Sequence, residues 1–367
     1  MTRADVASPL GVLIGTRPNI PKVYSLIKAL RASDVPFVLM HTNQHHDFGM
    51  QQAFFDQLGF APDLIMGDYS IGAAIDWAIR QITERGIRLL FVQGDSAPAL
   101  VGSIAAVYTD IGLAHVEAGL RANDGQMIEE RNRMMVDDVA HYLFCYTDKQ
   151  ARALRTVPFL RGHIHSVGNP TIDAIRDFQG IWDRPFDIPF PDYAFVTLHR
   201  KELTDSKERM VVVLAALRRC TEDFGLRIVL PMHPRTLQRA SLYGINLEET
   251  LGPGVSMLEP VGFFDSLRYQ RNARLVITDS GCIQEEACLL GVPCVTIRDN
   301  TERAETLEVG ANVLAGYTDH RIHEAVEKAM SSETRWSHPY GAPGAGQRAL
   351  DIVLGTFVDF RTYGRTP

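Results

Sequence analysis

Three acidic residues in the first half of the chain are candidates for proton transfer. Asp95 and Glu117 each directly follow an apolar segment, and Glu129 stands beside Glu130, twelve residues after Glu117, at the expected start of a helix. Because a carboxylate is costly to bury without a partner, we expect Asp95 and Glu117 to line a cleft rather than to be packing residues. For Glu129 and Glu130 alone, a simple interaction with the helix dipole is the stronger interpretation.

A second group of residues in the first half has the chemistry to hold phosphate. The segment 15–19, Gly-Thr-Arg-Pro-Asn, follows the first apolar run, and Lys22 comes one turn later. Glycine permits a sharp turn, free amides at a helix N-terminus attract anions, and the Arg17 guanidinium is suited to phosphate oxygens. The alternative interpretation is an ordinary exposed loop arginine.

Two histidines occupy equivalent positions in the second half. His199 and His233 each follow an apolar segment closely. A histidine at such a point is often only a structural cap, but two in neighbouring units favour a shared cleft. A charged loop behind a later apolar segment adds Arg298, Thr301 and Glu302.

The segment 278–286, Thr-Asp-Ser-Gly-Cys-Ile-Gln-Glu-Glu, is the strongest single motif. An apolar run meets a helix there through small residues, so the amides around Ser280 and Gly281 are suited to a diphosphate. Glu286 lies about two turns into the helix, near where a ribose could bind.

Alternating strands and helices must position these residues. The apolar runs are uniform enough to be buried on both faces, which predicts parallel sheets covered by helices. The expected strands are 10–14, 36–41, 89–93, 114–116, 142–146 and 163–167 in the first half, and 194–198, 227–231, 255–258, 275–278, 292–297 and 311–315 in the second.

A proline-containing stretch at 177–192 separates the two halves and predicts a linker. The sequence therefore predicts an α/β protein with two doubly wound parallel-sheet domains, 1–176 and 177–346, and an interdomain cleft. A flexible loop at 341–346 leads to a last helix, about 347–360, and we expect the tail 347–367 to pack back on the first domain.

Composition excludes several classes of function. The chain has 367 residues and a net charge of −7, so no overall basic field attracts nucleic acid or an anionic membrane. No apolar run is long enough for a membrane span, and the N-terminus lacks the apolar region of a signal peptide, which predicts a cytoplasmic protein. The five cysteines form no C-x-x-C pair, so we expect no metal.

Eight short motifs occur in the order found in UDP-N-acetylglucosamine 2-epimerases, and the chain resembles that family from about residue 10 to residue 354. They are Gly-Thr-Arg-Pro, Gly-Asp, Val-Glu-Ala-Gly-Leu-Arg, Glu-Glu-x-Asn-Arg, Gly-Asn-Pro-x-x-Asp, His-Arg-x-Glu, Asp-Ser-Gly-x-x-Gln-Glu-Glu and Thr-Glu-Arg-x-Glu. The resemblance implies a GT-B fold of two Rossmann-like domains, with UDP held mainly by the second and the sugar facing acids of the first. It also implies a UDP-sugar substrate, no cofactor and a homodimer.

The resemblance also implies roles for individual residues. Asp95, Glu117 and Glu129 become the acid/base groups, and His199 stabilises the departing diphosphate. Contacts with the UDP-sugar are expected from Arg17, Lys22, Arg121, Arg133, Asn169, His233, Phe263, Ser280, Gly281, Glu286, Arg298, Thr301 and Glu302.

Family members interconvert UDP-GlcNAc and UDP-ManNAc, and close relatives act on 2,3-diacetamido sugars. The implied route breaks the bond between carbon 1 and the diphosphate, removes the proton at carbon 2 to give a 2-acetamidoglucal, and re-adds UDP with protonation from the other face. The alternatives are a hydrolysing epimerase that releases ManNAc and UDP, a GT-B glycosyltransferase, and a catalytically silent nucleotide-sugar sensor. A nicotinamide-dependent route is disfavoured because the first strand lacks G-x-G-x-x-G.

Several residues depart from the family pattern. Asn19 stands where Glu is usual, Ile128 where Pro is usual, Leu203 where Asn is usual and Cys282 where Gly is usual. Ser266 replaces a frequent aromatic residue, which leaves uracil stacking to Phe263 or Phe264. The short spacing between Glu117 and Glu129 is typical of members that include the diacetamido-sugar enzymes.

Overall fold

A computed structural model describes residues 8–44, 48–332 and 335–356 of the chain. The chain divides into two compact units. Residues 1–177 together with 340–367 form the first domain, and residues 178–339 form the second. In the described part of the chain, no helix has the length and apolar character that crossing a membrane requires.

The first domain contains a seven-stranded parallel sheet with the order β3-β2-β1-β4-β5-β6-β7. The order reverses between β1 and β4, which is where doubly wound sheets bind ligands. Its strands are β1 (Leu10–Ile14), β2 (Phe37–His41), β3 (Leu64–Ile65), β4 (Leu89–Gln93), β5 (Gly112–Val116), β6 (Tyr142–Cys145) and β7 (His163–Ser166).

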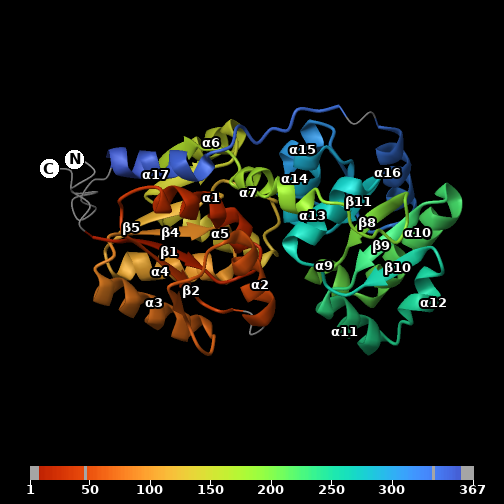
Figure 1. Cartoon of the computed structure of the whole chain (residues 1–367), viewed down its shortest axis with the longest axis horizontal. Helices are drawn as coiled ribbons and strands as arrows, with labels where there is room; N and C mark the ends of the chain where they lie inside the picture. Colours follow the sequence, from red (N-terminus) through yellow and green to blue (C-terminus); the bar gives the residue numbers. More distant parts are fainter. Residues whose placement is uncertain (1–7, 45–47, 333–334, 357–367) are drawn as a thin grey trace. The chain divides into compact units, whose positions relative to one another are not determined.

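Helices cover both faces of this sheet. In Figure 1, α1 and α17 lie along one face while α3 and α4 lie along the other. Each connection between parallel strands runs through such a helix, as a βαβ unit requires. The helices are α1 (Asn19–Arg31), α2 (Phe48–Leu58), α3 (Ile71–Arg85), α4 (Ala97–Tyr108), α5 (Ile128–Val139), α6 (Asp148–Arg155), α7 (Thr171–Asp177) and α17 (Ala345–Thr356).

The second domain repeats the arrangement with six parallel strands in the order β10-β9-β8-β11-β12-β13. Its strands are β8 (Tyr193–Thr197), β9 (Arg227–Pro231), β10 (Val255–Leu258), β11 (Leu275–Thr278), β12 (Cys294–Thr296) and β13 (Asn312–Leu314). Its helices are α8 (Gln179–Trp182), α9 (Lys201–Thr204), α10 (Lys207–Phe224), α11 (Pro234–Tyr243), α12 (Leu247–Leu251), α13 (Phe263–Asn272), α14 (Gly281–Leu290), α15 (Ala304–Glu308) and α16 (Asp319–Ser331).

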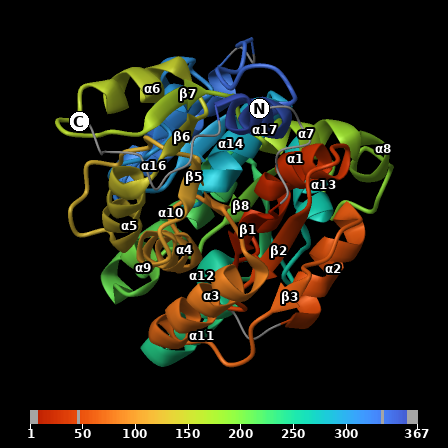
Figure 2. The same ribbon diagram turned by 90° about the vertical axis from the view of Figure 1, so that its left-hand side faces the viewer.

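The C-terminal helix α17 packs on α1, at the opposite end of the sequence (Figures 1 and 2). Gly346 makes this contact close, since its N–H donates to Ser25 Oγ at 2.8 Å and its Cα lies against the Ser25 backbone. The Asp173 carboxylate accepts from Ser25 Oγ at 2.7 Å and from Gly344 N at 2.9 Å. The Gly-Asn-Pro-x-x-Asp motif therefore anchors the C-terminal segment.

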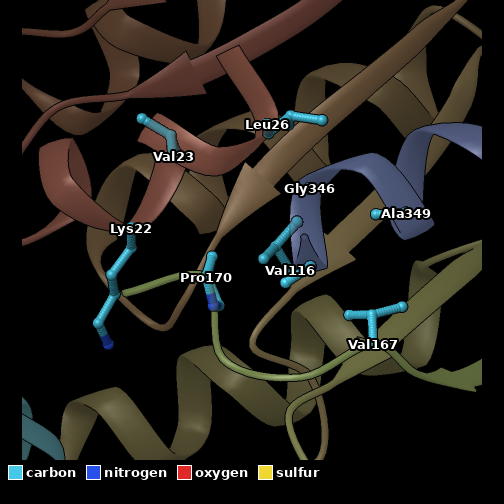
Figure 3. Close-up of a pocket in the computed structure, with 9 residues that line it drawn as sticks. Lys22, Val23, Leu26, Val116, Val167, Pro170, Gly346 and Ala349 are labelled. Carbon is cyan, nitrogen blue, oxygen red and sulfur yellow. The ribbon is translucent and has the colours of Figure 1, made fainter. Parts of the chain in front are cut away.

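A small cavity lies where α1, β5 and α17 meet. Figure 3 shows Lys22, Val116 and Pro170 around it, with Gly346 on the facing helix. Its volume is only about 10 Å³ and its lining is almost entirely apolar, so it has no place for an ordered water. The aliphatic stem of Lys22 packs here, and only its ammonium group is left for polar partners.

The structure confirms the predicted fold class of two α/β domains with parallel sheets. Every expected strand is present, with ends within two residues of the predicted ones, and the two-residue strand β3 was missed. The expected linker is wrong in part, because α8 forms within it and buries Trp182. The predicted flexible loop at 341–346 is also wrong, because its last residues belong to α17 or are hydrogen-bonded to Asp173. Predicted helix residues beyond 356 lie outside the described part.

Two glycines of α17 test the packing of this helix. A Cβ added at Gly346 lies 2.2 Å from the Ser25 carbonyl carbon, whereas one added at Gly355 meets nothing within 4 Å. We expect Gly346→Ala to lower the free energy of unfolding of the first domain by about 1–3 kcal/mol. Gly355→Ala should be neutral or stabilise by up to about 1 kcal/mol. Thermal unfolding of both variants measures the difference, and equal effects would contradict the close contact.

Candidate active site

Three loops of the first domain meet at the carboxyl edge of its sheet. Strand β1 pairs with β4 and β4 pairs with β5, so the segments that follow these strands lie side by side. They carry Arg17, Asp95 and Glu117 respectively. The predicted acids Asp95 and Glu117 thus sit at neighbouring strand ends, close to the switch point between β1 and β4.

Glu117 is held on both carboxylate oxygens. Lys22 Nζ lies 2.7 Å from Oε1, and Gln93 Nε2 donates to Oε2. The Glu117 side chain is buried, and its backbone has a φ of +77°, which is unusual for a residue with a side chain. Such backbone strain persists where surrounding contacts fix it and is concentrated at functional sites.

Asp95 is fixed by α5. Its carboxylate forms an ion pair with Arg133, whose other nitrogen lies 2.6 Å from Glu130 Oε2. Glu130 also accepts hydrogen bonds from the backbone N–H groups of Ala122 and Asn123. Glu130 therefore supports the loop and Arg133, while the half-buried Glu129 beside it occupies the first turn of the helix.

A histidine behind the two acids joins their loops. His115 Nδ1 lies 2.7 Å from Asp137 Oδ1, and Nε2 lies 2.9 Å from the Gly94 carbonyl oxygen. Asp137 also pairs with Arg121 at 2.7 Å. Burial opposes the charge of Asp137, but the hydrogen bond and charge of His115, with Arg121, outweigh burial and hold the pKa of Asp137 below its ordinary value.

The second domain brings three strand ends together in the same way. Strand β8 pairs with both β9 and β11, which places the residues after these strands at one edge. Asp279 is fully buried there, and its Oδ2 accepts the backbone N–H groups of His199 and Arg200 at 2.7 and 2.8 Å. Its Oδ1 lies 3.0 Å from His199 Nδ1.

These contacts decide the protonation of Asp279. Burial raises its pKa, but the charge of His199 and the hydrogen bonds from His199 and Arg200 outweigh burial, so the pKa lies below its ordinary value. Asp279 thus carries the negative charge that orients His199.

The two predicted histidines are neighbours. The ring centroids of His199 and His233 are 5.2 Å apart, and the rings are tilted by 33°. His233 caps α11 by accepting the Arg235 backbone N–H at Nδ1, so in the neutral ring the hydrogen is on Nε2. His199 points Nδ1 at Asp279, which leaves its Nε2 for a ligand, and its side chain is 33% exposed.

Helix α14 begins at Gly281, directly after Ser280. A Cβ at Gly281 would lie 2.4 Å from Glu302 Oε1, so a larger residue at this helix start would require the Glu302 carboxylate to move. Glu302 is buried and pairs with Arg298 at 2.9 Å, with Arg200 3.7 Å from its other oxygen. The predicted charged loop is therefore packed against the helix start.

The remaining predicted contacts of the second domain are mostly buried. Glu286 accepts from Gln270 Nε2 at 2.6 Å, and Thr301 donates to Gln284 Oε1 at 2.7 Å. Phe263 is buried at the start of α13. Their contacts with a ligand stay predictions.

Two predicted ligand contacts in the first domain have structural partners. Asn169 is fully buried, and its Oδ1 accepts the Thr171 backbone N–H at 2.9 Å. Arg133 is buried between two carboxylates. Arg17 is half-buried in segment 15–19, which follows β1, and its contact with phosphate stays a prediction.

Sequence reasoning missed four residues that orient the candidate groups. Gln93 and His115 lie on strands, and nothing in the strand pattern distinguishes them from core positions. Asp137 is on α5 and resembles an ordinary helix surface residue. Asp279 was visible within its motif, where its place immediately after a buried strand is the signal.

Asp279 offers a test of these electrostatics. We expect Asp279→Asn to lower the free energy of unfolding at neutral pH by on the order of 3 kcal/mol, because backbone donors and His199 lose a charged acceptor. Because the folded pKa is depressed, this contribution is present above the unfolded pKa near ~3.9 and is lost as pH falls through the folded value.

Denaturant unfolding between neutral and acidic pH measures this dependence. Asp265→Asn is the matched control, since that carboxylate is 47% exposed in its pair with Arg268 and should contribute at most about 1 kcal/mol. A difference between wild type and Asp279→Asn that stays constant down to the most acidic pH would show that the charge is not the cause.

The chain is similar to known proteins along most of its length. The chain matches the model of a family described as UDP-N-acetylglucosamine 2-epimerase over residues 28–354. It is 35% identical to the UDP-N-acetylglucosamine 2-epimerase of Methanococcus maripaludis over 94% of this chain and 98% of that protein. It is 33% identical to the UDP-2,3-diacetamido-2,3-dideoxy-D-glucuronate 2-epimerase of Pseudomonas aeruginosa over 93% of this chain and 98% of that protein.

A solved structure is also similar along nearly the whole chain. It is a crystal structure of Methanocaldococcus jannaschii UDP-GlcNAc 2-epimerase in complex with UDP-GlcNAc and UDP, with 33% identity and a TM-score of 0.88. The similarity covers 95% of this chain and 99% of that chain. With the family matched over most of its length, this chain belongs to the UDP-N-acetylglucosamine 2-epimerases, a family of isomerases.

Proposed function

We propose that this protein inverts carbon 2 of a UDP-N-acetylhexosamine, UDP-GlcNAc or a related 2-acetamido or 2,3-diacetamido sugar, to the manno form. The observation that carries the proposal is the pair of carboxylates, Asp95 and Glu117, held at adjacent strand ends by Arg133 and Lys22. Glu129 on α5 is the third acid.

The reaction explains why such groups are needed. The proton at carbon 2 is not next to a carbonyl, so direct removal by a carboxylate is far too unfavourable. Breaking the bond from carbon 1 to the diphosphate first gives an oxocarbenium-like centre, which acidifies that proton. Its loss leaves a 2-acetamidoglucal and UDP. Protonation from the opposite face, with re-addition of UDP, then inverts carbon 2. General acid/base groups on both faces of the ring are required.

The departing diphosphate needs donors that stabilise its charge. The ten-residue helix α14 begins at Gly281, directly after its N-cap Ser280, and the N–H groups of a helix start favour an anion. His199 is oriented by Asp279 and, when its ring is protonated, can donate from Nε2 to stabilise the diphosphate, and His233 lies beside it. Arg17 adds a guanidinium from the first domain.

The substrate, the assembly and the location are also proposals. One relative is named for a diacetamido-glucuronate sugar and another for UDP-GlcNAc, and both are about equally similar to this chain. We propose the non-hydrolysing reaction, in which UDP returns to the sugar, and a homodimer in the cytoplasm.

Proton NMR in deuterium oxide tests the reaction. With UDP-GlcNAc, we expect a manno product that carries deuterium at carbon 2, because the abstracted proton exchanges with solvent before another group returns one. Free ManNAc with UDP would indicate the hydrolysing alternative. Product without deuterium, or transfer that requires an acceptor, would overturn the proposed route.

Amide variants test the three acids in the same assay. Asp95→Asn, Glu117→Gln and Glu129→Gln keep the side-chain shape but remove proton transfer, so each should lower kcat by about 10²–10⁴-fold. Asp138→Asn, on the exposed face of α5, is the matched control and should keep kcat within about twofold. Near wild-type turnover in all three amide variants would leave these carboxylates without the proposed role.

Calorimetry with UDP tests the diphosphate site. Arg17→Ala and Ser280→Ala should each weaken binding by about tenfold, which corresponds to about 1.4 kcal/mol for a lost charged or polar contact. Ser241→Ala, at an exposed position of α11, is the control. Unchanged UDP affinity in both site variants would place the diphosphate elsewhere.

A further inference from the structure

A relay of side-chain hydrogen bonds leads from segment 15–19, which follows β1, to Glu117. Thr16 donates to Asn19 Oδ1 from its backbone N–H at 3.2 Å and from its hydroxyl at 2.7 Å. Asn19 Nδ2 donates to Gln93 Oε1, and Gln93 Nε2 donates to Glu117 Oε2. All four side chains are buried.

The first hydrogen bond, between Thr16 and Asn19, fixes the direction of the whole relay. A backbone N–H can only donate, so the Asn19 atom that faces Thr16 is the amide oxygen. The Asn19 nitrogen must then face Gln93, and it meets the Gln93 amide oxygen. Gln93 in turn has only its nitrogen left for Glu117. Each amide sets the orientation of the next one.

The last hydrogen bond of this relay favours the ionised form of the Glu117 carboxyl group. One of its oxygens receives the Gln93 amide and the other lies 2.7 Å from the Lys22 ammonium. Donors on both oxygens favour the charged carboxylate, while a protonated carboxyl would place a hydrogen against one of them. Because Glu117 is buried, these donors also replace the water that it lacks.

We propose that Asn19 and Gln93 are positioning residues that hold Glu117 as an ionised carboxylate, ready to accept a proton. The catalytic use of Glu117 rests on the proposed function, but the hydrogen-bond relay itself does not. An acidic side chain at position 19 could accept from Thr16 but could not donate to Gln93. The hydrogen bond between residues 19 and 93 would then no longer set the orientation of the Gln93 amide. Asn19, which can accept from Thr16 and donate to Gln93, is therefore suited to this relay.

A cycle of stability measurements tests the relay without substrate. Asn19→Asp keeps the shape but leaves two acceptors facing each other at one end of Gln93, so we expect Tm to fall by ~2–10 °C. In a Glu117→Gln background Gln93 can turn over, donate to the carboxylate introduced at position 19 and accept from the amide introduced at position 117, so the fall should largely vanish. Asn272→Asp, the same change at an exposed helix position, is the control.

A third background separates the relay from direct repulsion between the two carboxylates. With Gln93→Met the hydrogen-bond relay is interrupted, so the effect of Asn19→Asp on Tm should no longer depend on the residue at position 117. Direct repulsion would survive that change and would overturn the relay, as would an Asn19→Asp effect that is equal in all backgrounds. If Asn19→Asp does not fold in the wild-type background, Asn19→Ala, which removes the donor without adding charge, completes the same cycle.

The pH dependence of kcat/KM tests the effect on Glu117. Loss of the Gln93 donor in Gln93→Met should move the acid limb of the profile to higher pH by about one unit, because the charged carboxylate is less stabilised. Gln347→Met on α17, also an amide that donates to a carboxylate but outside the candidate site, is the matched variant and should leave the limb in place. An unmoved limb in Gln93→Met would overturn the positioning role.

Should the wild-type protein fail to epimerise any UDP-sugar, the proposed function fails while the stability cycle still decides whether the relay exists. Should epimerisation occur without coupling between residues 19 and 117, the function stands and the relay does not.

Discussion

The cost of burying a carboxylate at a strand end is the constraint on which the rest of this structure depends. Glu117, Asp137 and Asp279 are each almost completely removed from water, and Asp95 is partly removed. An isolated charge in such a place is so unfavourable that it would be protonated or expelled. Each carboxylate is instead matched by a cation or by several donors.

The two domains meet this constraint with different partners. In the first domain, cationic side chains come from helices that follow the strands, Lys22 on α1 and Arg133 on α5. In the second domain, Asp279 is matched by backbone amides and His199. The first arrangement holds the acids in ion pairs with side chains, and the second uses a fully buried acid to orient a partly exposed histidine. The carboxyl edge thus holds acids paired with cations in the sheet of the first domain and an acid that orients a histidine in the sheet of the second.

Much of the fold was predictable, because uniformly apolar runs with polar ends leave few alternatives to parallel strands. Asp95, Glu117 and His199 were predictable for the same reason, since polar residues directly after such runs lie at the carboxyl edge of a sheet. The residues that hold these groups in place were not predictable from the sequence. Gln93 ends a strand and looks like a core residue with a polar side chain, and its direction depends on Asn19, which is 74 positions away in the chain.

Packing between distant segments was equally beyond the reach of a local pattern. The stretch 341–346 has the glycine and proline content of a flexible loop, yet Asp173 and Ser25 bind its backbone. The need for glycine at position 346 comes from the closeness of α1 and not from a turn. A composition rule describes the freedom of the unfolded segment and contains no information on what will pack against it.

The pairing of acids also resolves an apparent conflict between the net charge of −7 and an anionic ligand. A UDP-sugar that approached unpaired carboxylates at the ends of β4 and β5 would meet repulsion where it must bind. Lys22 lies within ion-pair distance of Glu117, so this pair is nearly neutral beyond a few ångströms, while Arg133 offsets one of the two negative charges of Asp95 and Glu130. Under the proposed function, the acids can still transfer protons at short range, while a diphosphate that approaches meets less repulsion than it would from unpaired carboxylates. Pairing therefore allows an acidic protein to combine carboxylate chemistry with the binding of an anion.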